Sequence, residues 1–135
     1  MAHWLVKTEP STYSYDDLER EKRARWDGVA NAVALKNLRG MAPGDEVMVY
    51  HTGNEKAVVG LARVVSEPYP DPKAGDAKLT VVDLEPNKRL ARPVTLAEVK
   101  ADPAFAEFAL VRIGRLSVLP VPPAIWKRLL QMAAK

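Results

Sequence analysis

Two apolar runs separated by only a few residues narrow the choice of fold for this chain. Residues 47–50 are all apolar and follow a turn pattern at Pro43 and Gly44, which predicts a strand buried on both faces. After a turn at residues 51–54, residues 57–65 show a second, longer strand pattern. Parallel neighbours need a linking segment of about a dozen residues or more, and this connection is too short. The two strands are therefore expected to pair antiparallel, which disfavours an alternating doubly wound α/β fold.

The rest of the chain alternates between short strands and capped helices. Further strands are expected at residues 3–7, 79–84, 90–94 and 109–112, the third of them after a turn at Pro86 and Asn87. Gly60, inside the second central strand, indicates a bulge or the close approach of another group. About five to six short strands with flanking helices predict an α+β fold, a small curved β-barrel.

Helix boundaries are marked by local capping patterns. Capping boxes are expected at Ser14 with Asp17 and at Thr95 with Glu98. A helix over residues 31–39 is expected to end at Gly40, and a closing helix is indicated by apolar residues at helical spacing, Ile125, Leu129 and Met132.

Composition excludes several kinds of site. The chain has 135 residues, 47% of them hydrophobic, which suits one domain spanning residues 1–135. It has no cysteine, so disulfides, thiolate nucleophiles and cysteine-ligated zinc are excluded. The only histidines, His3 and His51, do not have a metal-ligand spacing, and neither a metal nor a cofactor is expected.

Targeting patterns and charge say less about the function than the excluded kinds of site do. The sequence shows neither a signal-peptide pattern nor an apolar run long enough for a membrane span, so a cytoplasmic location without membrane contact is expected. The net charge of +3 is compatible with an anionic partner but does not identify one. Basic residues scattered along the sequence would form a phosphate-facing rim only if the fold gathers them: Lys22, Arg23, Arg25, Lys88, Arg89, Arg92, Arg112 and Arg115.

Polar residues follow the first expected strand. Lys7 and Thr8 stand where a buried strand emerges, so Lys7 could meet a phosphate and Thr8 could hydrogen-bond a base or sugar. The alternative is a solvated turn in which Lys7 forms a weak surface pair with Glu9.

Trp26 is the candidate for stacking on a planar ligand. It precedes Asp27 and Gly28, and a glycine there would let a ligand or the backbone approach closely. A base stacked on an indole gains about 1–3 kcal/mol. The alternative is that Trp26 fills space between a helix and the sheet, as is expected of Trp4 and Trp126 in the core.

Three polar or aromatic residues end the central strand. If that strand continues, Tyr50 and Thr52 share one face and His51 points to the other. His51 could act as a general base, but no serine or cysteine nucleophile motif accompanies it. Catalysis is therefore the weaker interpretation.

Taken in order, short segments of the chain resemble the EVE domain family almost from end to end. The matching segments are residues 3–10, 26–29 with Asn31, 37–39, 44–45, 50–52, 60–62, 69–71, 115–118 and 120–121. This resemblance implies a PUA-like fold, similar in plan to YTH and ASCH domains. It also implies a non-catalytic nucleic-acid-binding module, monomeric or weakly dimeric, that recognises a modified base such as a modified cytosine in DNA.

On that resemblance, one tryptophan-lined pocket would be formed by Lys7, Thr8, Trp26, Asn31, Tyr50, His51 and Thr52, with Arg115 and Ser117 near its mouth. Trp26 would stack on the base, Asn31 and Thr8 would read its polar edge, and Lys7 would neutralise phosphate. The alternatives are an RNA-binding module acting on tRNA or rRNA, and a small hydrolase using His51 with Glu9.

The chain departs from the family pattern at several positions. The family commonly has an arginine where this sequence has Ala30, an aromatic residue at Ala32, and a tryptophan where Leu79 falls. Where the family usually has Ala-Arg-Asn, residues 34–36 read Ala-Leu-Lys. Losing an arginine and two aromatic residues near a stacking pocket could change which base is bound or weaken binding.

Overall fold

Seven strands form a strongly curled sheet in residues 1–76 and 78–134, which the computed structural model describes. Six of them follow one another in the order β2-β6-β4-β3-β1-β7, and β5 pairs with β6 beside this path. The strands are β1 (His3–Thr8), β2 (Ala24–Trp26), β3 (Glu46–His51), β4 (Ala57–Val64), β5 (Tyr69–Pro70), β6 (Thr80–Thr95) and β7 (Val118–Pro120). The helices are α1 (Tyr15–Glu21), α2 (Ala32–Arg39), α3 (Leu96–Ala101), α4 (Ala109–Arg112) and α5 (Pro123–Ala133), with a 3-10 turn, η1 (Pro103–Phe105).

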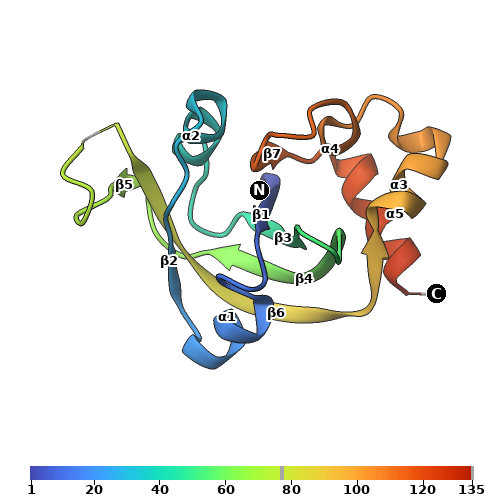
Figure 1. The fold of residues 1–135 in the computed structure, drawn as a ribbon, viewed down its shortest axis with the longest axis horizontal. Helices are drawn as coiled ribbons and strands as arrows, with labels where there is room; N and C mark the ends of the chain where they lie inside the picture. Colours follow the sequence, from blue (N-terminus) through green and yellow to red (C-terminus); the bar gives the residue numbers. More distant parts are fainter. Residues whose placement is uncertain (77, 135) are drawn as a thin grey trace.

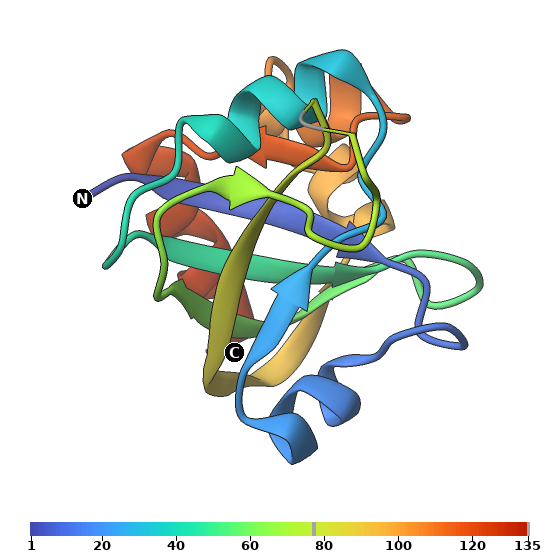
Figure 2. The same cartoon turned by 90° about the vertical axis from the view of Figure 1, so that its left-hand side faces the viewer.

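The central pairing is the one predicted. β3 and β4 are antiparallel neighbours, and β1 lies parallel to β3 on the other side. The parallel pair is possible because the long connection from β1 to β3 contains α1, β2 and α2. β2 runs between α1 and α2 at one side of the sheet, as both views show (Figures 1 and 2). The α+β prediction is confirmed, with more strands than the five to six expected.

β6 corrects one prediction. Residues 79–84 and 90–94 were expected as two strands separated by a turn, but residues 80–95 form a single bent strand (Figure 1). Its register against β4 shifts twice, once between Leu61 and Ala62, where Asn87 becomes an extra residue. Such bulges bend a strand without ending it, and they accommodate a proline that cannot donate to the ladder. The residues that indicated a turn therefore form a bend within the strand.

Other elements also differ from expectation. Residues 109–112 form one helical turn rather than a strand, which shows that so short an apolar run does not distinguish the two structures. β2 and β7, with three residues each, were not predicted. Pairing with β6 and with β1 makes these short segments extended, and neither pairing partner is close in sequence.

The capping predictions are confirmed. Both capping boxes form, at Ser14 with Asp17 and at Thr95 with Glu98. The helix predicted over residues 31–39 is α2, between Asn31 as N-cap and Gly40 as C-cap.

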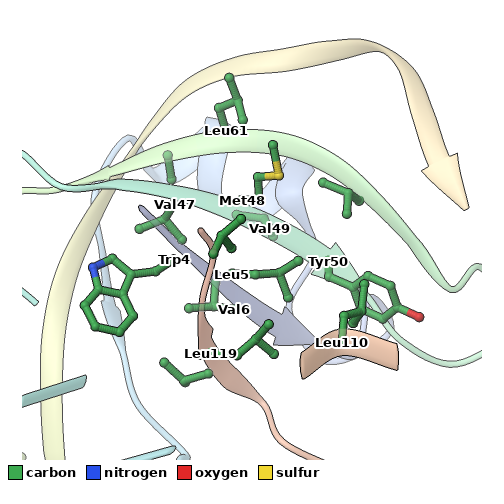
Figure 3. Close-up of a cluster of buried hydrophobic side chains, with 14 of the residues drawn as sticks. Trp4, Leu5, Val6, Val47, Met48, Val49, Tyr50, Leu61, Leu110 and Leu119 are labelled. Atoms are coloured by element: carbon green, nitrogen blue, oxygen red, sulfur yellow. The ribbon is translucent and has the colours of Figure 1, made fainter. Parts of the chain in front are cut away.

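One hydrophobic cluster fills the space between the curled sheet and the helices. Figure 3 shows its centre, where Leu5 and Val6 of β1 lie beside side chains of the neighbouring strand β3. Trp4 and Trp126 are buried, as predicted, and the Trp4 indole Nε1 donates to Asp45 Oδ2 at 2.9 Å. The Tyr15 ring lies directly on Gly60, so the predicted close approach is confirmed. None of the helices in the described part of the chain is long and apolar enough to cross a membrane.

Candidate functional site

A cavity of about 410 Å³ opens beside Trp26, between the end of β1, the segment before α1, and β2 with the turn that follows it. We call it the Trp26 cavity. Several of its lining residues are exposed, so it is open to solvent. Its lining residues are Lys7, Thr8, Thr12, Tyr13, Glu21, Ala24, Arg25, Trp26, Asp27, Gly28, Val29 and Ser117.

Trp26 reaches the cavity because β2 pairs with β6. The pairing sets Trp26 opposite Val82, and the alternation of a strand buries Ala24 and Trp26 while Arg25 stays partly exposed. Only 6% of Trp26 is exposed. Its Nε1 makes no hydrogen bond to a described residue, and no buried side-chain nitrogen or oxygen in that part of the chain lacks a partner. The indole N–H is therefore accessible and can donate to a ligand.

Tyr13 forms a second aromatic wall. Its ring meets that of Trp26 edge to face, with centroids 6.1 Å apart and planes at 86°. Its hydroxyl donates to Glu21 Oε1 at 2.8 Å, and its carbonyl accepts from Thr8 Oγ1 at 2.7 Å. Burial and the bond to Glu21 raise the pKa of Tyr13, so the phenol remains protonated at neutral pH. The two rings form a rigid apolar corner.

The polar groups of the cavity come from opposite ends of the sequence. The Lys7 backbone N–H donates to the Ser117 carbonyl at 2.9 Å, and the Lys7 ammonium donates to the Gly114 carbonyl at 2.9 Å. Burial lowers the pKa of Lys7. On the opposite wall Arg25 Nε donates to the Tyr69 hydroxyl at 3.3 Å, which holds the guanidinium beside the cavity.

The turn after Trp26 keeps one side open. Gly28 has φ +78°, in the left-handed region that favours glycine, and an added Cβ would meet no atom within 4 Å. A planar group could therefore approach this backbone closely.

Four of the nine predicted binding residues lie together in the Trp26 cavity, namely Lys7, Thr8, Trp26 and Ser117. Of the other five, Asn31 and Arg115 do not line this cavity. Asn31 is exposed and caps α2, where its Oδ1 accepts from the backbone N–H groups of residues 33 and 34. Arg115 is exposed on the turn between α4 and β7.

Tyr50 and Thr52 lie in a different cavity, which we call the Tyr50 cavity. It has a volume of about 230 Å³ and shares Lys7 with the Trp26 cavity. Its lining residues are Lys7, Tyr50, Thr52, Gly53, Lys56, Leu96, Lys100, Leu110, Val111 and Gly114.

His51 is buried on the opposite face of β3. Its Nε2 accepts from the Tyr15 backbone N–H at 3.0 Å, and its Nδ1 lies 2.7 Å from Glu55 Oε1. These contacts assign the proton to Nδ1. Both ring nitrogens are engaged, and the bond to Tyr15 connects β3 to the start of α1. The predicted binding residues therefore do not share a single pocket, since Tyr50 and Thr52 line a second cavity and His51 lines neither.

Sequence reasoning did not select Tyr13 or Arg25 for the site. Tyr13 belongs to none of the patterns that indicate a site, and Arg25 is one of several basic residues scattered along the sequence. The available signal was the alternation of apolar and charged residues at positions 24–26. If this segment is a strand, Ala24 and Trp26 lie on one face and Arg25 on the other. Among the departures from the family pattern, Ala30 and Ala32 are exposed, and Ala30, Ala32 and Leu79 do not line the Trp26 cavity.

Comparison with known proteins places these features in a family. A model of the EVE domain matches residues 2–132. Human thymocyte nuclear protein 1 is 31% identical over 126 residues, which cover 74% of this chain and 56% of that protein. The chain thus spans about half the length of the curated relatives it matches.

Solved structures share the fold. Rpa0253 from Rhodopseudomonas palustris is 40% identical, with a TM-score of 0.94 and coverage of 99% of this chain and 94% of that one. Human THYN1, solved in complex with DNA containing 5-methylcytosine, is 28% identical with a TM-score of 0.92 over 100% and 99% of the two chains. An ASCH protein from Zymomonas mobilis, at 11% identity and a TM-score of 0.62 over 97% and 95%, shares the fold alone. The expected PUA-like α+β fold is confirmed.

Proposed function

The chain belongs to the EVE domain family, and we propose that it is a non-catalytic nucleic-acid-binding module that holds one nucleobase in the Trp26 cavity. The observation that carries this proposal is the corner formed by Trp26 and Tyr13, which is open to solvent and has hydrogen-bonding groups around it. A flat heteroaromatic ring fits such a corner, because it stacks on one ring and meets the edge of the other.

The size and polarity of the cavity suit a base. Its volume of about 410 Å³ lies within the range of roughly 300–1,000 Å³ that is typical of small-ligand sites. The Trp26 indole N–H and the lining residues Lys7 and Ser117 provide hydrogen-bonding groups for the edge of the base or for its sugar-phosphate. A base inside a duplex cannot reach a pocket, so the ligand is a flipped or single-stranded nucleotide.

Modified cytosine in DNA is the ligand that we favour. The support is the human THYN1 structure with 5-methylcytosine-containing DNA, whose fold superposes on this chain with a TM-score of 0.92. In this chain Ala24 and Val29 give the Trp26 cavity apolar surface that a 5-methyl group could contact. RNA is the competing ligand, distinguished by its 2′-hydroxyl.

The absence of turnover is part of the proposal. A hydrolase would depend on His51, which is buried with both nitrogens engaged and does not line the Trp26 cavity. This arrangement suits a structural role and gives His51 no route to a base in that cavity.

Fluorescence anisotropy with labelled oligonucleotides tests the proposal. Matched DNA and RNA strands would carry cytosine or 5-methylcytosine at one central position. We expect tightest binding to the modified DNA and a loss of about 1–3 kcal/mol, roughly 5- to 150-fold, in Trp26→Ala. Tighter binding to RNA would favour the RNA alternative. Equal binding of every oligonucleotide by wild type and Trp26→Ala would exclude the Trp26 cavity as the base site.

A matched pair of variants separates binding from stability. Truncating a buried tryptophan to alanine costs about 3–5 kcal/mol of stability, so Trp26→Phe is compared with Trp4→Phe. Both replace a buried indole by a phenyl ring, but Trp4 lies outside the Trp26 cavity and loses its bond to Asp45. We expect Trp26→Phe to weaken binding, and Trp4→Phe to lower the melting temperature without changing affinity.

A further inference from the structure

Three lysines from different parts of the chain line the Tyr50 cavity. Lys7 comes from the end of β1, Lys56 from the turn between β3 and β4, and Lys100 from the last turn of α3. Leu96, Leu110 and Val111 provide apolar wall between them. The fold thus gathers three positive charges in one small cavity.

No carboxylate of a described residue forms an ion pair with these lysines. Among residues 1–76 and 78–134, none of the three ammonium groups has an acidic oxygen within 4.0 Å, the limit for an ion pair. Ion pairs in that part of the chain instead involve a histidine or one of six arginines: Arg20, Arg23, Arg89, Arg92, Arg112 and Arg128. Like charges held together without a counter-ion favour an anionic ligand.

Lys7 is held in position, unlike an ordinary solvated lysine. Its ammonium bonds the Gly114 carbonyl and lies 5.6 Å from the centroid of the Tyr50 ring. An ammonium group has three N–H donors, so two remain for a ligand. The Tyr50 hydroxyl makes no hydrogen bond to a described residue, and Figure 3 shows it directed away from the apolar cluster beside Leu110.

Lys56 has an unfavourable backbone conformation. Its φ is +47°, which costs a residue with a Cβ about 1–2 kcal/mol. The conformation is held because the Lys56 carbonyl accepts from the Leu96 backbone N–H at 2.8 Å. Strained residues of this kind concentrate at functional sites.

We propose that the Tyr50 cavity binds a phosphate group of the nucleic acid whose base occupies the Trp26 cavity. This inference rests on the proposed function, because Lys7 lines both cavities and so places the phosphate beside the bound base. The volume of about 230 Å³ is below the roughly 300–1,000 Å³ of small-ligand sites, which suits a phosphate group and part of a sugar better than a second base. Lys56 and Lys100 hold the phosphate by charge, and the Tyr50 hydroxyl donates to it.

The negative charge of Glu9 weakens the binding of an anion in the Tyr50 cavity. Its carboxylate lies against Gly53, a lining residue of the Tyr50 cavity, and it is held by Ser11 and Thr52. Removing this charge with Glu9→Gln is expected to tighten nucleic-acid binding.

The salt dependence of binding to single-stranded DNA tests the proposal. Each phosphate neutralised on a single strand contributes about 0.7 to the slope of log affinity against log salt concentration. In the double variant Lys56→Gln/Lys100→Gln we expect this slope to fall in magnitude by about 0.7, with weaker binding at low salt. The preference for modified over unmodified cytosine should not change, because a phosphate contact carries no base information.

The double variant Lys73→Gln/Lys78→Gln is the control. It removes the same charge near β5, at the opposite end of the molecule from α3 in Figure 1, and neither lysine lines either cavity. We expect its slope to stay close to that of wild type. Equal slopes for the two double variants would overturn the proposal.

Titration with inorganic phosphate at constant ionic strength separates this inference from the proposed function. In wild type, amide NMR shifts confined to residues around Gly53 and Gly114 are expected without any nucleic acid. If wild type binds no oligonucleotide, the proposed function is wrong, and shifts in this titration would identify a site for free phosphate instead. Absence of such shifts, or shifts that persist in Lys56→Gln/Lys100→Gln, would overturn the phosphate site itself.

Discussion

Replacing Gly60 with alanine would place a methyl group against the ring of Tyr15. A Cβ at this position would lie 2.4 Å from the Cε1 and Cζ atoms of that ring, whereas non-bonded carbons prefer about 3.5–4.0 Å. Tyr15 cannot yield easily, because its hydroxyl donates to the Leu61 carbonyl at 2.6 Å and its backbone N–H donates to His51. Overpacking costs about 1–3 kcal/mol, and losing the hydroxyl bond adds about 0.5–1.5 kcal/mol. We therefore expect Gly60→Ala to lose about 1.5–4.5 kcal/mol of stability.

Thermal unfolding followed by circular dichroism measures this loss. For a domain of this size it corresponds to a decrease in melting temperature of about 5–20 °C. Gly114→Ala is the control, because a Cβ there would meet no atom within 4 Å. If the Tyr15 ring is the cause, Gly60→Ala should cost much less in a Tyr15→Leu background. Equal melting temperatures for Gly60→Ala and Gly114→Ala, or additive losses in the double variant, would refute this reasoning.

Three further predictions concern the loss of stability at low pH, the buried histidine and the turn after Trp26. Hydrogen bonds from Arg92 lower the pKa of Glu98 from 4.5 to about 2, so its stabilising contribution is present above pH 4.5 and is lost as the pH falls toward 2. In urea unfolding, the difference in free energy of unfolding between wild type and Glu98→Gln should shrink over that range. His51→Phe leaves the Tyr15 backbone N–H buried without an acceptor and should cost about 1–3 kcal/mol in urea unfolding, whereas a purely apolar role for His51 predicts no loss. Gly28→Ala should cost about 1–2 kcal/mol of stability through its positive φ alone, and a smaller loss in Gly28→Asn, whose side chain tolerates this region, distinguishes backbone strain from a steric clash.

Local signals in the sequence were reliable where a few neighbouring residues decide the structure. The capping boxes at Ser14 and Thr95 formed as expected, because donor and acceptor lie within one turn of helix. The bend of β6 was not predictable in the same way. Whether Asn87 ends a strand or becomes a bulge depends on how β6 pairs with β4. The residues near Asn87 give no information about that register.

The candidate site shows the same division. Trp26 was selected for its residue type, but the segment that carries it becomes a strand only by pairing with β6, so Tyr13 and Arg25 could not be placed beside it. Strand alternation predicted that His51 faces away from Tyr50, and the structure confirms this. Grouping the two in one pocket because they adjoin in sequence was the weaker step, since neighbours on a strand point to opposite faces.

The bond from the Lys7 ammonium to the Gly114 carbonyl has a consequence for the newly made chain. The two residues are 107 positions apart in sequence, and the ribosome releases the amino-terminal residue first. Lys7 is therefore synthesised well before the segment around Gly114 and Ser117, which fixes its side chain and lines both cavities. We expect a nascent chain halted before Gly114 not to bind nucleic acid, including the ribosomal RNA around it. Binding should begin only after the segment that follows Gly114 has been synthesised.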